Sequence, residues 1–458
     1  MPSEFRILSA TGILGSGFPE DSILRALDWE PQAIGCDSGS TDPGPYLLGA
    51  DALFFPRAAY ARDLRLILRA ARSRRIPTLI GSAGGAGTDG QLATLRDILC
   101  EVARDEGLHF RLALIRAEQD KGRLQARLRQ GRIRPLDGAP PLTPEALDAT
   151  DRVVAMMGAE PFQRAVGMGA EVVLAGRSSD TAIFAALPLQ AGLPPGPAWH
   201  AAKVLECGAA AVEQRLAPDC LFAVVREDGF TVSPPNPRLR CTPVSVAAHG
   251  LYENASPYEL TEPPGTVDTR ACRYEPEGGR GVRVTGSRFR PADRYTVKLE
   301  GAALAGYQAL AIAGIRDPFV LEGLEKFLAE VRDRVAERAR DTCGPSLEAG
   351  DYHLLFRVYG HDGSMGPLEP VRDARPHEVG LVIQVTARTQ ELANTVLAAA
   401  RHIALHHPVP RWSGLTSNLA FPYAPADIQR GPTYRFTLNH VLEPDDPWEP
   451  FPIELVEV

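Results

Sequence analysis

The stretch from Phe5 to Trp29, FRILSATGILGSGFPEDSILRALDW, decides the fold because it joins a strand pattern to a helix pattern. FRILSATG is a short apolar run that ends in a glycine turn, as a buried strand does. The helix pattern that follows has Pro19, Glu20 and Asp21 in its first turn, where proline fits and the helix dipole favours acids. The stretch therefore predicts one strand followed by one helix.

The same alternation continues to about residue 216. Four further strand patterns are PQAIGCDSG (31–39), IPTLIGSAGG (76–85), HFRLALIRAE (109–118) and AEVVLAGRSSD (170–180). Helical patterns separate and follow them, including two between Leu142 and Gly169 and a long one at 197–216, PAWHAAKVLECGAAAVEQRL. Repeated strand–helix alternation predicts an α/β fold, a Rossmann-like, mainly parallel sheet with helices on both faces.

The remainder of the chain differs from the first 216 residues in composition and in the length of its strand patterns. Proline, glycine and charged residues increase between Ser233 and Pro291, and the strand patterns there are short. From Asp351 the patterns read strand, strand, helix, strand, which is enough for a small α+β domain. A chain of 458 residues predicts two or three domains, and we place them at 1–216, 217–345 (a mixed α/β region) and 346–458.

Composition and charge limit the kinds of partner that the protein is expected to have. The chain is 44% hydrophobic and carries a formal net charge of −8, which allows a sizeable core and argues against nucleic acid as a partner. The sequence has neither an 18-residue apolar window nor a signal-peptide pattern at its start, so we expect no membrane partner. Seven cysteines without a CxxC pair fit free thiols in a reducing compartment. These features predict a cytoplasmic protein.

Small, acidic or hydroxyl residues follow the predicted strands. Ligands of open parallel sheets bind outside the carboxyl ends of the strands, so these residues predict one polar crevice. The segment CDSGSTDPGPYLLG (36–49) would form one of its walls. The candidates are Asp37, Ser38, Ser40, Thr41, Asp42, Ser82, Gly84, Gly85, Glu118, Arg177, Ser178 and Asp180.

Substrate binding is the first role that these candidates suggest. Arg177 could pair with a carboxylate or phosphate, although it could equally hold Asp180 or Glu118 in place. The run GSAGGAG, which starts at Gly81, resembles a phosphate-binding glycine loop but lacks the P-loop lysine, so plain turn glycines explain it equally well. The hydroxyl groups of Ser38, Ser40, Thr41 and Ser178 would complete the binding surface.

Proton transfer and cation binding are the other two roles. We expect Asp37, Glu118 and His249 to be the catalytic acids and bases, because carboxyl and imidazole groups can move protons near neutral pH. His249 could instead be a structural histidine. Asp37, Asp42 and Asp180 could hold a divalent cation such as Mg²⁺ or Ca²⁺ through oxygen ligands.

Several motifs together resemble the acyclic terpene utilisation (AtuA) family. They are GCDSGSTDPGPYLLG, LIGSAGGAG, FRLALIRAE, VVLAGRSSD, KVLECGA and NPRLRCTPVSVAAHGLYE, in this order along the chain. The tail, especially SNLAFPYAPADIQRGPTYRFTLNH (417–440), looks like the small ferredoxin-fold-like domain that accompanies this family. The resemblance implies a Rossmann-like main region and bacterial catabolism of carboxylic acids or CoA thioesters. It implies no particular reaction, although some members carry ammonia-lyase-like labels.

Three functions remain open at this stage. The first is a lyase or hydratase, of the hydro-lyase or ammonia-lyase type, acting on a small carboxylic acid or its CoA thioester. The second is a metal-assisted amide or ester hydrolase, and the third is a non-catalytic acyl-CoA-binding or scaffold subunit. A homo-oligomer is expected from the apolar residues of the tail EPDDPWEPFPIELVEV (443–458), although packing on its own domain explains them equally well.

Overall fold

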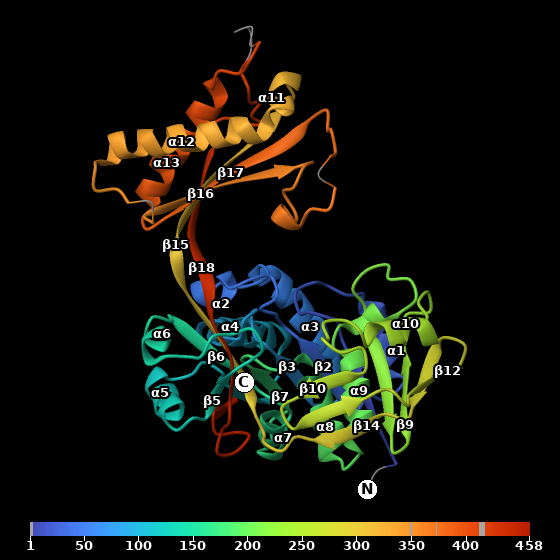
Figure 1. Cartoon of the computed structure of the whole chain (residues 1–458). Helices are drawn as coiled ribbons and strands as arrows, with labels where there is room; N and C mark the ends of the chain where they lie inside the picture. The colour runs from blue at the N-terminus through green and yellow to red at the C-terminus, as the bar shows by residue number, and fades with distance from the viewer. Residues whose placement is uncertain (1–2, 349, 372, 412–416) are drawn as a thin grey trace. The chain divides into compact units, whose positions relative to one another are not determined.

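The computed structural model describes residues 3–348, 350–371, 373–411 and 417–458 (Figure 1). The chain divides into two compact units, one formed by residues 1–303 and 436–458 and the other by residues 304–435. Strands β15 (Val297–Ile315) and β18 (Asp427–Leu442) each continue from one unit into the other. The units differ from the three ranges expected from the sequence, which followed changes in composition rather than contacts.

The first unit is built on a ten-stranded sheet whose centre is parallel. Five strands lie side by side in this part, and each is parallel to its neighbours. In sheet order they are β1 (Glu4–Ser9), β2 (Ala33–Asp37), β3 (Thr78–Gly81), β7 (Val172–Ala175) and β4 (Arg111–Ile115). These are the five strands that the alternation predicts, and β2, β3 and β7 are buried along their whole length.

Antiparallel strands extend this sheet at both edges. Beyond β1 follow β8 (Leu221–Arg226), β9 (Gly229–Ser233), β13 (Gly281–Thr285) and β12 (Arg273–Glu277). At the other edge β19 (Ile453–Glu457) pairs with β4, and Phe451 before it is buried. The C-terminal tail therefore packs on its own chain and no longer supports the expected homo-oligomer.

Helices cover both faces of the sheet, as predicted, and a separate apolar core lies on each face. Residues of α1, α3 and α4 join one core, and residues of α7, α8 and α9 join the other. The helices of this unit are α1 (Glu20–Leu27), α2 (Tyr46–Ala50), α3 (Arg57–Arg74), α4 (Asp89–Glu106), α5 (Lys121–Arg129), α6 (Pro144–Asp148), α7 (Glu160–Gly167), α8 (Asp180–Gln190), α9 (Pro195–Leu205) and α10 (Pro243–His249).

The two helices expected between Leu142 and Gly169 are α6 and α7. Between them lies a strand that the sequence analysis did not find, β6 (Arg152–Met156), which pairs antiparallel with the first part of β15. A buried run this short cannot be told from helix by its periodicity. The helix predicted at 197–216 ends at Leu205, because Gly208 has a φ of +57° and a Cβ there would lie 2.7 Å from the Asp219 carbonyl oxygen.

The remaining strands of the first unit are short. β10 (Glu259–Glu262), β11 (Gly265–Asp268) and β14 (Arg288–Pro291) form a three-stranded antiparallel sheet, and β5 (Ile133–Pro135) pairs with the end of β18.

The second unit is a four-stranded sheet with helices packed on it. The strands lie in the order β16 (Tyr352–Tyr359), β17 (Val379–Ala387), β15 and β18. Along β17 buried residues alternate with half-buried ones, and the buried ones share a core with α11 (Pro318–Glu322), α12 (Leu324–Cys343) and α13 (Gln390–His406). The predicted boundary at 346 thus separated α12 from the strands that it covers.

Within the described ranges, no helix combines the length and apolar character needed to cross a lipid bilayer.

Candidate active site

The segments that follow β2, β3 and β7 meet at the carboxyl ends of these strands. Gly39 permits the closest approach, since a Cβ at this position would lie 2.0 Å from the carbonyl oxygen of Gly85. The Ser82 hydroxyl then joins the second and third segments, because it lies 3.3 Å from both the backbone nitrogen and the carbonyl oxygen of Ser178. The glycine and hydroxyl residues after these strands therefore serve first to bring three loops together.

Arg177 is buried at this junction and is fully engaged by the protein. Its Nε lies 2.8 Å from Glu300 on β15, and its other nitrogens lie 3.2 Å from the Ser82 hydroxyl and 3.5 Å from the Thr41 hydroxyl. Burial alone would raise the pKa of Glu300, but the charges of Arg177 and of Lys298, 2.9 Å away, lower it to about 2. Arg177 thus has two acidic partners, Glu300 at 2.8 Å and, at 3.8 Å, Asp180, which the sequence had suggested.

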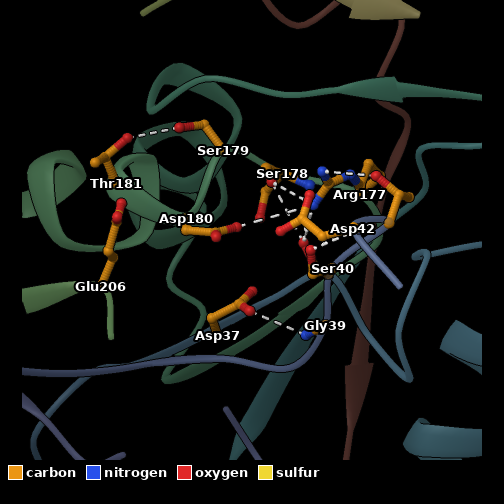
Figure 2. Close-up of polar contacts among 12 residues, drawn as sticks. Asp37, Gly39, Ser40, Asp42, Arg177, Ser178, Ser179, Asp180, Thr181 and Glu206 are labelled. Carbon is orange, nitrogen blue, oxygen red and sulfur yellow. Dashed lines mark hydrogen bonds and ion pairs between the residues drawn. The ribbon is translucent and has the colours of Figure 1, made fainter. Parts of the chain in front are cut away.

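Asp37, at the end of β2, is the most unusual carboxyl group of the site (Figure 2). The residue is only 4% exposed; its Oδ2 accepts a 3.0 Å hydrogen bond from the Gly39 amide, while Oδ1 has no hydrogen-bond partner among the described residues. Burial, and then the negative charge of Asp180, raise the pKa of Asp37 well above its usual range.

Asp180, the first residue of α8, lies beside Asp37 but in a different environment. Its side chain is 31% exposed and lies 3.8 Å from Arg177. Burial raises the pKa of Asp180 to about 6, against the lowering effect of the Arg177 and Lys203 charges. The site therefore holds two neighbouring carboxyl groups, of which one is enclosed and the other reaches solvent.

Further buried charges continue from Asp180 into the protein. Lys203 of α9 lies 2.5 Å from Glu206, and burial raises the pKa of Glu206 to about 8. Glu262 of β10 accepts hydrogen bonds from the hydroxyl groups of Ser179 and Thr181, and burial raises its pKa to about 7. Sequence reasoning missed these residues, although two charges three positions apart in the apolar run AAKVLECG are a signal that could have found them.

Glu118 does not join this cluster. It follows β4, which lies three strands from β2, a separation of about 14 Å at the usual strand spacing. Its two carboxylate oxygens are engaged by Arg152 at 2.8 Å and by the Asp89 amide at 3.0 Å, at the start of α4. These contacts give Glu118 a helix-capping role.

His249 is the last residue of α10 and lies near Glu206 and Cys207. One of its ring nitrogens is within 4.8 Å of a carboxylate oxygen of Glu206 and of the Cys207 sulfur. Burial, with the charge of Lys203, lowers the pKa of His249 to about 4. The imidazole is therefore neutral at pH 7 and stacks on Tyr252, with ring centroids 6.0 Å apart.

Four amides of the glycine loop after β3 are hydrogen-bonded within the protein. The amides of Ser82 and Ala83 donate to the carbonyl oxygens of Gly176 and Ala175. The Gly84 amide donates to the Ser38 hydroxyl, and the Gly85 amide to the Ser82 carbonyl oxygen. These four groups are engaged in joining the loops.

The expected cation ligands are not gathered around one point. Asp42 is exposed, and its amide is bound by the Ser40 hydroxyl at 3.0 Å. In the part of the chain that the structure describes, Asp37, Asp42 and Asp180 do not form a group with ligand atoms within 4.8 Å of one another. The Ser178 hydroxyl oxygen is buried and has no hydrogen-bond partner among the described residues, so it could bind a substrate atom.

A mixed sheet with a parallel centre, and a group of buried and half-buried carboxyl groups near its strand ends, define an α/β protein with an acid-rich polar site. The chain belongs to the acyclic terpene utilisation family AtuA, whose model matches residues 54–420. That range includes Arg177, Glu206, His249 and Glu300 and begins after the Asp37 loop. Neither a curated protein nor a solved structure matches the chain.

Proposed function

We propose that the chain is an enzyme of the lyase or hydratase type. It acts on a small carboxylic acid or its CoA thioester and transfers protons at the carbon next to the carbonyl group. The observation that carries this proposal is the enclosed Asp37 carboxyl group, with one oxygen unpartnered among the described residues, beside the partly exposed Asp180. Neighbouring carboxyl groups in unlike environments are the arrangement that separates an acid from a base.

The two groups divide the reaction between them. Asp180, ionised at neutral pH, removes the proton from the α carbon, and the electron pair of that C–H bond forms the carbon–carbon double bond. Asp37, whose raised pKa favours the protonated form, gives its proton to the group that leaves the β carbon as water or an amine. Proton exchange with solvent then restores both groups.

Other residues position the substrate. The unpartnered Ser178 hydroxyl can donate a hydrogen bond to the substrate carbonyl, where negative charge develops during proton removal. Arg177 holds the loops in register through Glu300 and Ser82. This arrangement makes Arg177 a positioning residue instead of the anion anchor expected from the sequence.

The charge of the site does not choose between the two forms of the reaction. The Arg177–Glu300 pair is neutral overall, and raised pKa values favour the protonated forms of Asp37 and of Glu206, whose pKa is about 8. The hydro-lyase and ammonia-lyase forms therefore both stay in the proposal, and in either form the leaving group accepts the proton of Asp37 as a neutral hydroxyl or amino group.

The test is exchange of the α hydrogen in D₂O, followed by mass spectrometry over β-amino acids, β-hydroxy acids and their CoA thioesters. Asp37→Asn removes the proton donor while keeping the shape of the side chain, and we expect it to lower turnover by at least about 100-fold. Asp97→Asn is the control, because Asp97 is an exposed partner of Arg96 on α4.

The outcomes separate the candidate functions. An Asp37→Asn variant that turns over like the wild type would exclude this mechanism. Amide or ester cleavage that depends on metal would support the hydrolase instead. Binding of CoA thioesters with neither exchange nor products would support the non-catalytic subunit.

We propose three further features that agree with this function. The parallel centre of the first unit is Rossmann-like, and the second unit is ferredoxin-like, as antiparallel strands with helices on one face suggest. The protein acts in the cytoplasm of a bacterium, without nucleic-acid or membrane partners. Homo-oligomerisation stays a prediction, to be checked by light scattering.

A further inference from the structure

A second group of polar side chains lies inward of the carboxyl pair. The side-chain ligand atoms of Glu206, Cys207 and His249 all lie within 4.8 Å of one another. His249 is only 8% exposed, and its Nε2 atom has no hydrogen-bond partner among the described residues. A buried polar atom without a hydrogen-bond partner is destabilising, so this nitrogen is available to bind a ligand that the described residues do not supply.

The local fold holds the two segments of the group in place. Glu206 is the C-cap of α9 and Cys207 follows it, after which the chain turns sharply at Gly208 into the 3₁₀ helix η1 (Gly208–Ala211). The Ser245 hydroxyl of α10 donates a 2.7 Å hydrogen bond to the Ala211 carbonyl oxygen. This bond anchors α10, which ends at His249, to the segment that carries the other two residues.

The electrostatic surroundings favour a cation. Both α9 and α10 end at the group, and the C-terminal end of a helix carries partial negative charge. Asp180 and Glu262 act on Glu206 as further negative charges, while Lys203 and, at His249, Arg215 act as positive ones. Lys203 contacts a single carboxylate oxygen of Glu206, Oε1, which leaves Oε2 for another partner.

We propose that Glu206, Cys207 and His249 bind a divalent transition metal ion of the zinc class. Carboxylate oxygen, thiolate sulfur and imidazole nitrogen are the ligands that zinc takes in proteins. Tetrahedral bonds of about 2.0–2.3 Å place ligand atoms about 3.4 Å apart, so each separation in the group would shorten by at most about 1.4 Å around the ion. Cys207 is half-buried, which gives the ion a path to the group.

Three protein ligands leave a fourth coordination position open, as in catalytic zinc sites. A water molecule or a substrate oxygen could occupy it, because the neighbouring Asp180 opens to solvent. The bound ion would supply Lewis-acid chemistry to the crevice. Soft and borderline ligands distinguish this group from the oxygen-only Mg²⁺ or Ca²⁺ site expected at Asp37, Asp42 and Asp180.

The experiment measures metal binding directly and so does not depend on the proposed reaction. The full chain is stripped with chelator, incubated with Zn²⁺ or Co²⁺, freed of unbound ion by gel filtration and analysed for metal. We expect one ion per chain, release of the Cys207 proton on binding, and a thiolate-to-cobalt absorption band in the Co²⁺ form.

The variants test each ligand. Cys207→Ser should abolish the thiolate band, and Glu206→Gln and His249→Gln should each weaken Zn²⁺ binding by more than the 10- to 100-fold that loss of an outer-sphere partner costs. Cys100→Ser is the matched control, because Cys100 is likewise half-buried but lies on α4. Circular dichroism confirms that each variant is folded.

Two results would overturn the proposal. One is a stripped wild-type chain that retains no Zn²⁺ or Co²⁺ after gel filtration. The other is equal metal content and an equal cobalt spectrum in folded Cys207→Ser and Cys100→Ser. Loss of activity in Asp37→Asn with unchanged metal content would leave this site intact while testing the reaction separately.

Discussion

Replacing Glu300 with glutamine should be one of the most costly conservative substitutions in the first unit. Glu300 is the partner of Arg177, and both side chains are almost completely buried. Glutamine keeps the shape but removes the negative charge, so the buried Arg177 guanidinium loses its closest carboxylate partner and keeps the more distant Asp180 at 3.8 Å. Breaking a buried ion pair in this way costs about 3–5 kcal/mol.

The pKa of Glu300 gives an independent value for the same interaction. A pKa lowered from 4.5 to about 2 corresponds to about 3 kcal/mol of stabilisation by the ionised form. Because the pKa is lower in the folded state, this stabilisation is present above pH 4.5 and is lost as the pH falls towards 2. The difference between the wild type and Glu300→Gln should therefore shrink over this window.

Urea unfolding followed by tryptophan fluorescence is the assay, since Trp29, Trp199 and Trp448 all belong to the first unit. The control is Glu101→Gln, which breaks the exposed pair with Arg57, whose side chains are 50% and 56% exposed. An exposed pair contributes at most about 1 kcal/mol.

The reasoning is refuted if Glu300→Gln loses no more free energy of unfolding at pH 7 than Glu101→Gln does. A loss that stays constant between pH 4.5 and 2 would show that the charge of Glu300 is not its cause.

One further substitution and one alkylation reaction test the packing of the first unit. Gly39→Ala should destabilise the first unit by at least about 2 kcal/mol in the same urea assay, because its Cβ would meet the Gly85 carbonyl oxygen. The control is Gly167→Ala in the same unit, which should stay within about 1 kcal/mol because its Cβ would lie 3.9 Å from the end of the Gln190 side chain. Equal values would contradict the close approach of the two loops. Cys36 and Cys220 should resist an alkylating reagent at pH 7, because both are buried and burial raises the pKa of both thiols. The exposed Cys343 should react first, and mass spectrometry of the alkylated native chain gives the order of modification. Modification of Cys36 before Cys343 would contradict this expectation.

The periodicity of the sequence predicts the centre of the fold well. Each of the five apolar runs followed by a turn became a strand, and alternation with helices was enough to make them parallel neighbours. The loops after β2, β3 and β7 then had to share one edge of the sheet. Strand β6 was missed because its four apolar residues after Arg152 carry no periodicity that separates strand from helix.

The partners of the site residues could not be predicted in the same way. Glu300 lies 123 positions from Arg177, and nothing in local spacing relates them. Glu118 does follow a strand of the parallel sheet, as predicted. The order of the strands in the sheet could not be predicted, however, and it places β4 beyond β7, away from β2. Lys203 and Glu206 can be recognised in the sequence as two charges in an apolar helix. That His249, more than forty residues later, lies beside Glu206 and Cys207 could not be predicted from local spacing.

The division of the chain also governs the order in which the two units can be completed during synthesis. All of the second unit has been made once residue 435 has left the ribosome, whereas the first unit still lacks residues 436–458. These last residues include β19, which covers the β4 edge of the ten-stranded sheet. Although its residues begin the chain, the first unit is therefore finished last, and until then the nascent protein carries an open strand edge of the kind that invites aggregation.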